Sequence, residues 1–173
     1  MNISSHVLPE ADFARYHTFG WGPADALPTG DPRLDKDPFF QDHVLGAVER
    51  GLAARGLTAA SSGTPDLLIH YHASVSQRLD VNRLDREHGY CFDDDCRVRV
   101  VEVETATLVL DLVDARTNRL VWRGWARNNF LDTLDNSDRL ERDINAAVGG
   151  MLARYPAGPA APVRPQPAQT GGE

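Results

Sequence analysis

The chain has 173 residues, a formal net charge of −7 and a pI of about 5.3. This length suffices for one domain with a hydrophobic core, and the acidic balance argues against nucleic acid as the main partner. No apolar run approaches the length of a transmembrane span, and the N-terminal residues contain no apolar signal-peptide core. We therefore expect a protein that is either cytoplasmic or exported by a signal that was removed or is encoded upstream of Met1.

The first part of the chain predicts a strand followed by a helix. Residues 12–21 are rich in aromatic side chains and predict the first strand, which leaves residues 1–11 as an N-terminal extension. Asp37 has the character of an N-cap, and Pro38 follows at the first helical position. Apolar residues then recur every four positions, at Phe40, Val44, Val48 and Leu52. Gly56 stands where a C′ glycine ends a helix.

Residues 66–77 predict a second strand, because apolar and polar side chains alternate along them. The polar face of this strand contains His70 and His72. The polar stretch at 80–95 predicts a loop or an extension of a hairpin. Residues 97–104 predict a further strand that leads into the centre of the fold.

That centre is a β-hairpin in residues 107–130. Leucines alternate in its first arm, and the apolar set of the second arm is Leu120, Trp122, Gly124 and Ala126. The two apolar sets share one side of the sheet only if Leu112 faces Trp122, because a slip of one residue exchanges the faces. A three-residue loop, 116–118, gives this register, whereas a four-residue loop shifts it. Asn118 suits the left-handed third position of such a loop.

The same register fixes which hairpin residues lie on the other face of the sheet. It pairs Asp111 with Arg123 across the strands, a contact of the kind that contributes about 0.2–1 kcal/mol. Trp125 and Arg127 share this face, because they differ from Arg123 by even numbers. We expect Trp122, which has the opposite parity, to be buried in the core.

The last structured part of the chain predicts a helix that starts at Asn136 or Ser137 and ends at Pro156. Residues 157–173, rich in Pro, Ala, Gly and Gln, predict a disordered tail. The order is therefore β-α-β-β-β-α within one domain, residues 12–156. It predicts an α+β fold in which a twisted, mainly antiparallel sheet has both helices on one face.

These residues together resemble the bacterial domain-of-unknown-function family numbered 4136, whose members are mostly described as lipoproteins. The resemblance covers roughly residues 12–156, and its most specific portion is DARTNRLVWRG. It implies a domain on the periplasmic side of the cell envelope, often tethered by an N-terminal lipid-modified cysteine. The printed chain has neither a signal peptide nor such a cysteine, so we expect a leader, with its lipid anchor, upstream of Met1. The resemblance implies no catalytic residue.

Cys91 and Cys96 flank three aspartates in the segment CFDDDC. A small loop disulfide, formed in an oxidising compartment, is the favoured interpretation. Free thiols are one alternative. A zinc site that also uses His88 and a carboxylate is another, although the spacing is unusual for structural zinc.

His70 and His72 lie on the same side of one predicted strand, a spacing compatible with metal chelation. The sequence identifies no third ligand, so a polar sheet face is favoured, and a small-ligand or metal-binding domain is the alternative. No phosphate-binding glycine loop, GxSxG or HExxH motif is present. We predict a non-enzymatic envelope domain without a cofactor that binds an unidentified envelope protein or component. The residues of the predicted interaction face are His70, His72, Asp111, Arg123, Trp125 and Arg127.

Overall fold

A computed structural model describes residues 1–23, 34, 37–80, 101–128 and 136–156, with the backbone alone at 77–80 and 101–104. The elements in chain order are the strand β1 (Asn2–Val7), the 3-10 helix η1 (Phe13–Arg15), β2 (Thr18–Trp21), the helix α2 (Pro38–Ala53), β3 (Thr58–Ala59), β4 (Leu67–Asp80), β5 (Val101–Asp114), β6 (Arg119–Asn128) and the helix α4 (Ser137–Leu152). The predicted tail at 157–173 lies outside the described residues, as do Cys91 and Cys96.

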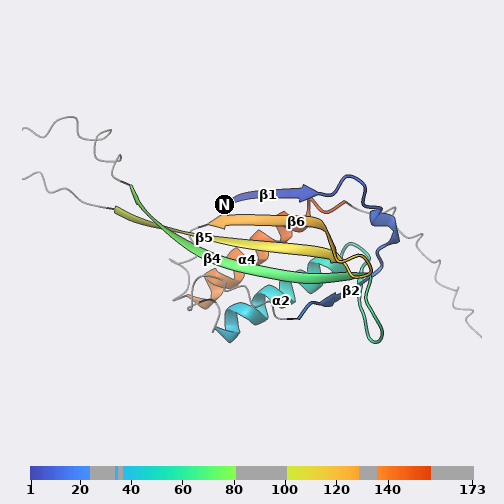
Figure 1. Cartoon of the computed structure of the whole chain (residues 1–173). Coiled ribbons are helices and arrows are strands. Elements are labelled where there is room, and N and C mark those ends of the chain that lie inside the picture. The colour runs from blue at the N-terminus through green and yellow to red at the C-terminus, as the bar shows by residue number, and fades with distance from the viewer. Residues whose placement is uncertain (24–33, 35–36, 81–100, 129–135, 157–173) are drawn as a thin grey trace, which may run out of the picture.

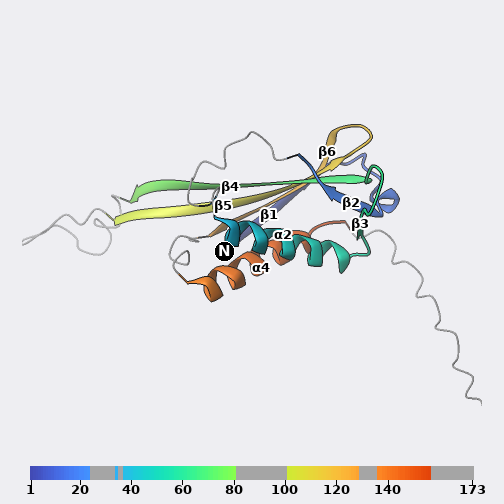
Figure 2. The same ribbon diagram turned by 90° about the horizontal axis from the view of Figure 1, so that it is seen from below.

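The described residues form two layers, a six-stranded sheet and the helices α2 and α4 (Figure 2). The strand order is β1-β6-β5-β4-β2-β3. Antiparallel pairing joins β1, β6, β5 and β4, whereas β2 is parallel to both β3 and β4. Both helices lie on the same side of the sheet, and β4 and β5 extend beyond the other strands (Figure 1). The predicted α+β fold, a mainly antiparallel sheet with both helices on one face, is confirmed.

The N-terminal part of the chain differs from the prediction. Asn2–Val7 form an edge strand that pairs antiparallel with β6, and they are not an extension outside the sheet. The predicted strand at 12–21 divides into η1 and β2, because the Asp12 side chain accepts a hydrogen bond from the Ala14 N–H and caps η1. With the two-residue β3, the sheet therefore has six strands where the sequence predicts four. The polar composition of β1, NISSHV, explains the omission, because it has few of the β-branched and aromatic residues that indicate a strand.

The central hairpin has the predicted register, but its loop is one residue longer than predicted. Leu112 faces Trp122, as parity requires. Asp114 pairs with Arg119, which makes the loop four residues long and would by itself shift the register. A β-bulge restores it, because Val121 is an extra residue on β6 with no partner on β5.

Asp114 and Asn118 shape the turn of this hairpin. Asn118 has a φ of 54°, the left-handed conformation that asparagine tolerates. One carboxylate oxygen of Asp114 accepts the backbone N–H groups of Arg116 and Thr117 at 2.9 Å each. The other oxygen accepts the hydroxyl of Tyr16 at 3.0 Å. The turn is thereby joined to the segment between η1 and β2.

Both helices begin where the sequence predicts. The side chain of Asp37 accepts the N–H groups of the first turn of α2, and the side chain of Asn136 does the same for α4. Gly56, with a φ of 84°, follows α2. Its N–H donates to the Ala53 carbonyl at 3.0 Å, and the Leu57 N–H donates to the Leu52 carbonyl at 3.2 Å, as in a Schellman motif.

The core lies between the helices and the sheet. Trp122 is 0% exposed, which confirms its predicted burial. The largest fully buried side chains are Trp122, Leu52, Leu67, Ile69, Leu110, Leu112, Leu140, Ile144, Met151, Leu152, Val44 and Val48. Burying an aliphatic side chain of this size contributes about 1.5–3 kcal/mol. None of the helices in the described ranges has the length and apolar character needed to cross a membrane.

Candidate functional site

The face of the sheet opposite the helices, called here the open face, gathers the residues predicted to bind a partner. Side chains paired across antiparallel strands point to the same face, so the strand register arranges them in rows. One row across β1, β6, β5 and β4 contains His6, Arg123, Asp111 and His70. The next row contains Ser4, Trp125, Val109 and His72. All six predicted residues thus share this face, with Arg127 one row further along.

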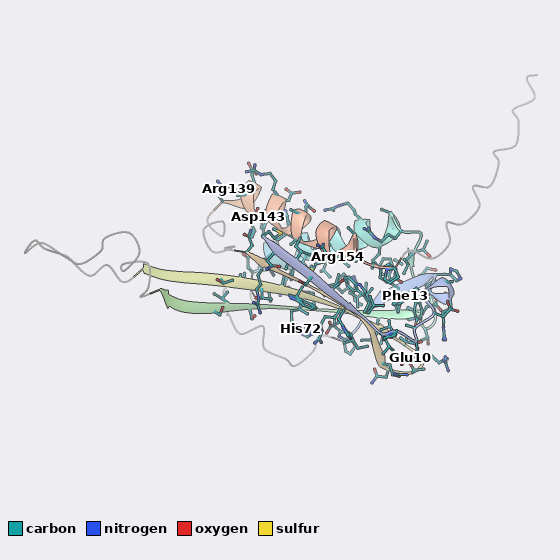
Figure 3. The ribbon with its side chains drawn as sticks, turned by 90° about the horizontal axis from the view of Figure 1, so that it is seen from above. Glu10, Phe13, His72, Arg139, Asp143 and Arg154 are labelled. Atoms are coloured by element: carbon teal, nitrogen blue, oxygen red, sulfur yellow. The ribbon has the colours of Figure 1, made fainter. Side chains whose placement is uncertain are left out.

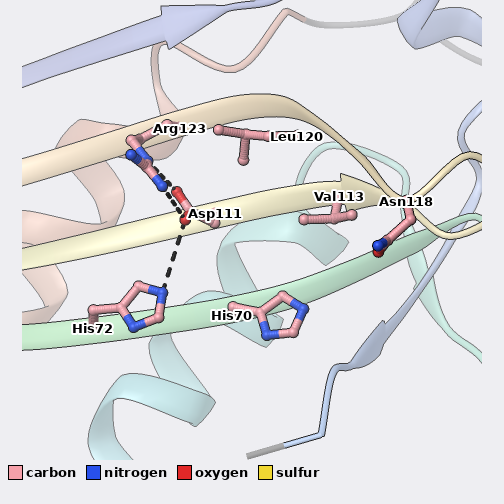
Figure 4. Close-up of a pocket in the computed structure, with 7 residues that line it drawn as sticks. All are labelled: His70, His72, Asp111, Val113, Asn118, Leu120 and Arg123. Atoms are coloured by element: carbon pink, nitrogen blue, oxygen red, sulfur yellow. Dashed lines mark hydrogen bonds and ion pairs between the residues drawn. The ribbon is translucent and has the colours of Figure 1, made fainter. Parts of the chain in front are cut away.

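Asp111 and Arg123 form the predicted cross-strand pair at the centre of the open face. Nε of Arg123 donates to Oδ1 of Asp111 and Nη2 donates to Oδ2, each at 2.6 Å (Figure 4). Asp111 is only 5% exposed, whereas the Arg123 side chain is 45% exposed. The hydrogen bonds that Arg123 donates to Asp111 raise the pKa of Arg123 above its usual value, although burial acts against it. The guanidinium is therefore a fixed, permanently charged group.

The two histidines flank this pair from β4. Nε2 of His72 lies 3.8 Å from Oδ2 of Asp111 (Figure 4). The His70 ring lies against the backbone of Gly22, where a Cβ atom would collide with it. Figure 3 shows His72 in the sheet layer, and Arg139 in the helix layer on α4.

The histidines do not complete a metal site in this arrangement. Across the part of the chain that the structure describes, no group of three His, Cys, Asp or Glu side chains could hold a metal ion. Both oxygens of Asp111, the nearest carboxylate to His72, already accept hydrogen bonds from Arg123. The metal alternative therefore lacks a third ligand among the described residues.

A shallow basin of about 310 Å³ is hollowed into the open face. Its lining residues are His70, His72, Asp111, Val113, Asn118, Leu120 and Arg123 (Figure 4). Val113 and Leu120 face each other across β5 and β6 and form its apolar wall. Asn118 belongs to the turn at the end of the two strands.

Sequence reasoning missed the apolar wall of the basin and assigned Leu120 to the wrong face. Alternation with Trp122 predicts that Leu120 points to the helices. The bulge at Val121 reverses that parity, so that Leu120 lies opposite Val113 on the open face and is 36% exposed. Val121 is 3% exposed in its place. A bulge with a buried valine leaves no signal in a simple alternating pattern.

Comparison with known proteins supports the family resemblance and the fold. The model of the family described as "Domain of unknown function (DUF4136)" matches residues 3–157, nearly the whole chain. A PDZ domain protein from Parabacteroides distasonis has a similar structure, with a TM-score of 0.58 and 17% identity over 89% of this chain. This chain spans 35% of that protein, and at this identity the likeness shows the fold alone.

A second solved structure, a PelC dodecamer from Paraburkholderia phytofirmans, matches with a TM-score of 0.43 and 11% identity. That match covers 88% of this chain and 98% of the PelC chain. Comparison with curated proteins found no match.

Proposed function

The chain belongs to the DUF4136 family, and from that premise we propose that it is a non-catalytic binding domain of the bacterial cell envelope. Its open face docks another envelope protein. The observation that carries the proposal is the composition of this face, where Trp125 lies between Arg123 and Arg127 on β6. Trp125 is half-buried and both arginines are exposed. Tryptophan and arginine are among the residues most enriched at the positions that dominate binding energy in protein interfaces.

The chemistry of the face supports binding over catalysis. A general base must come within hydrogen-bond reach of a substrate proton. The central carboxylate, Asp111, has both oxygens in hydrogen bonds to Arg123 and is almost fully buried. A site of this kind is rigid and charged, and it offers hydrogen-bond donors to a partner.

Site-specific photo-cross-linking in the native bacterium tests the proposal. A photoreactive amino acid placed at Trp125 or Arg127 of the full-length protein should give one discrete cross-linked partner. The same amino acid at Arg139 or Asp143, which lie on α4 in the helix layer (Figure 3), is the control and should not. Cross-links from α4 alone, or the same products from both layers, would contradict docking on the open face.

The envelope location is part of the same proposal and rests on the family resemblance. A full-length gene product should reach the periplasmic side, where a protease added to spheroplasts can cleave it. Radiolabelled palmitate should enter the precursor if the expected lipid anchor is present. Recovery of the intact, protease-protected protein in the cytoplasm would contradict the periplasmic location. Docking on the open face would then be tested separately, by cross-linking in lysates.

A further inference from the structure

We propose that the basin on the open face binds a carboxylate group carried on a short apolar body, held by the outer edge of the Arg123 guanidinium. This deepens the proposed function, on which it rests, because it names the chemistry that the open face recognises. The ligand group could be offered by the end of a partner's polypeptide chain or by a small organic acid. Both present the same carboxylate beside an apolar side chain.

The first support is the hydrogen-bonding state of Arg123. A guanidinium carries five N–H donors in a planar fork. Asp111 occupies the side of that fork formed by Nε and Nη2. Within the described ranges, no acceptor bonds Nη1 of Arg123. The end of the fork, between Nη1 and Nη2, therefore remains for a second carboxylate with two parallel hydrogen bonds.

The second support is that this fork is already held in place. Arg123 is fixed by two hydrogen bonds to a carboxylate that is itself 5% exposed and belongs to the central strand β5. A free surface arginine loses side-chain entropy when it binds, whereas a fixed one has already lost it. Asp111 thus acts as a positioning residue for Arg123, and its carboxylate lines the basin as the hydrogen-bonded partner of that guanidinium.

The third support is that the basin of this acidic protein exposes an arginine side chain. The net charge of −7 disfavours anions over the surface as a whole. In the basin, the one carboxylate is neutralised by Arg123, and His72 lies beside it. The Arg123 side chain is 45% exposed and its guanidinium carries donors only, so it suits an acceptor that carries negative charge.

The fourth support is the apolar wall, which favours a carboxylate with an apolar body over inorganic phosphate. Val113 and Leu120 face each other beside Arg123, and Leu120 is one of three exposed large hydrophobic residues in the described ranges. Small-ligand pockets hold about 300–1,000 Å³, and the basin, at about 310 Å³, is at the lower end. It therefore accommodates an acid with a few carbon atoms.

Titration of the isotope-labelled protein with 3-methylbutanoate, followed by NMR, tests the proposal. Saturable shifts at Arg123 Nε and at the backbone amides of Val113 and Leu120 are expected. The neutral amide of the same acid, acetate and inorganic phosphate should each bind at least about tenfold more weakly, a difference of one decade in Kd. Phosphate binding as tight as that of 3-methylbutanoate would overturn the assignment to a carboxylate. Absence of saturable shifts at Arg123 would overturn it as well.

Two variants with matched controls locate the binding. Leu120→Asp places a negative charge at an exposed wall position, and Phe39→Asp makes the same change at a position of 38% exposure on α2. The double variant Asp111→Asn/Arg123→Gln removes the fork without leaving a buried unpaired charge, and Arg139→Gln on α4 removes one positive charge from the opposite layer. We expect the two basin variants to lose binding by about tenfold or more. Equal losses in the controls would overturn the proposal.

The outcomes separate this proposal from the proposed function. If 3-methylbutanoate fails to bind while cross-links form from Trp125, the carboxylate assignment falls and docking on the open face stands. If 3-methylbutanoate binds at the basin but no cross-link forms from the open face in cells, docking of a protein falls and the small acid is the ligand.

Discussion

Asp111 and Arg123 face each other across β5 and β6 and share two hydrogen bonds of 2.6 Å, with the carboxylate buried and the guanidinium half in solvent. The pair joins these two neighbouring strands on the face opposite the described helices. Its geometry is bidentate, the arrangement in which arginine and carboxylate bind most strongly. The pair therefore links β5 to β6 and holds the exposed guanidinium of Arg123 in one position.

We expect Arg123→Gln to lower the free energy of unfolding by about 1–3 kcal/mol, because it leaves the Asp111 carboxylate without its charged partner. The figure is below that of a fully buried pair, since the Arg123 side chain is 45% exposed. The double variant Asp111→Asn/Arg123→Gln should recover part of the loss. Urea denaturation of the wild type, both single variants and the double variant gives the coupling energy. A coupling of zero would mean that the pair contributes nothing beyond its separate residues.

Trp122→Ala should cost about 3–5 kcal/mol of stability, as for other large-to-small changes in a core. Trp122 is 0% exposed, and its ring packs edge-on against Tyr155 with centroids 6.0 Å apart. Its indole N–H has no hydrogen-bond partner among the described residues, so Trp122→Phe should cost clearly less. Trp125→Ala, on the open face, is the control and should also cost less. Chemical denaturation of the variants measures these losses. A loss of stability in Trp125→Ala that equals or exceeds the loss in Trp122→Ala would mean that the core lies on the Trp125 face of the sheet.

The strand pairing of the central hairpin could be predicted because each strand has one apolar face and a slip of one residue would bury charge. That argument places Leu112 against Trp122 and Asp111 against Arg123, and both pairs are present. The helix starts could be predicted because the capping residues have a recognisable side chain. Asp37, for example, accepts hydrogen bonds from the first free N–H groups of α2.

The rest depends on contacts that a pattern does not contain. The β1 strand is specified by its neighbours, since it pairs with β6 and its Ile3 packs against Gly150 of α4, where a Cβ would collide with the Ile3 side chain. The basin depends on the bulge at Val121, which turns Leu120 to the open face. Neither a polar edge strand nor one extra residue in a hairpin changes the alternation of apolar and polar residues enough to be predicted from the sequence.

The hydrogen bond between Tyr16 and Asp114 should make stability depend on pH at both extremes. Burial raises the pKa of Asp114, but hydrogen bonds from Thr117, Tyr16 and Arg116 outweigh it and hold the pKa below its usual value. A lowered carboxyl pKa contributes stability above about pH 3.9, the unfolded value. That stability is lost as the pH falls through the lower folded value.

At the alkaline end, burial and the hydrogen bond to Asp114 raise the pKa of Tyr16 to about 12. The stability contributed by Tyr16 is complete below about pH 10, the unfolded value, and is lost as the pH rises towards the folded value. Tyr16→Phe should therefore flatten both limbs of a stability–pH profile measured by urea denaturation. An unchanged alkaline limb in this variant would show that another group controls it.

Two glycines should respond in opposite directions to alanine, because one lies against the core and the other faces open space. A Cβ at Gly124 would collide with the Trp122 ring and lie 3.0 Å from Cβ of Met151 on α4. Gly124→Ala should thus cost about 1–3 kcal/mol, the range for overpacking. A Cβ at Gly149 in α4 meets nothing within 4 Å among the described residues. Gly149→Ala should stabilise by up to about 1 kcal/mol through helix propensity. Thermal and urea denaturation measure both, and a Gly124→Ala variant as stable as the wild type would mean that α4 does not approach β6 this closely.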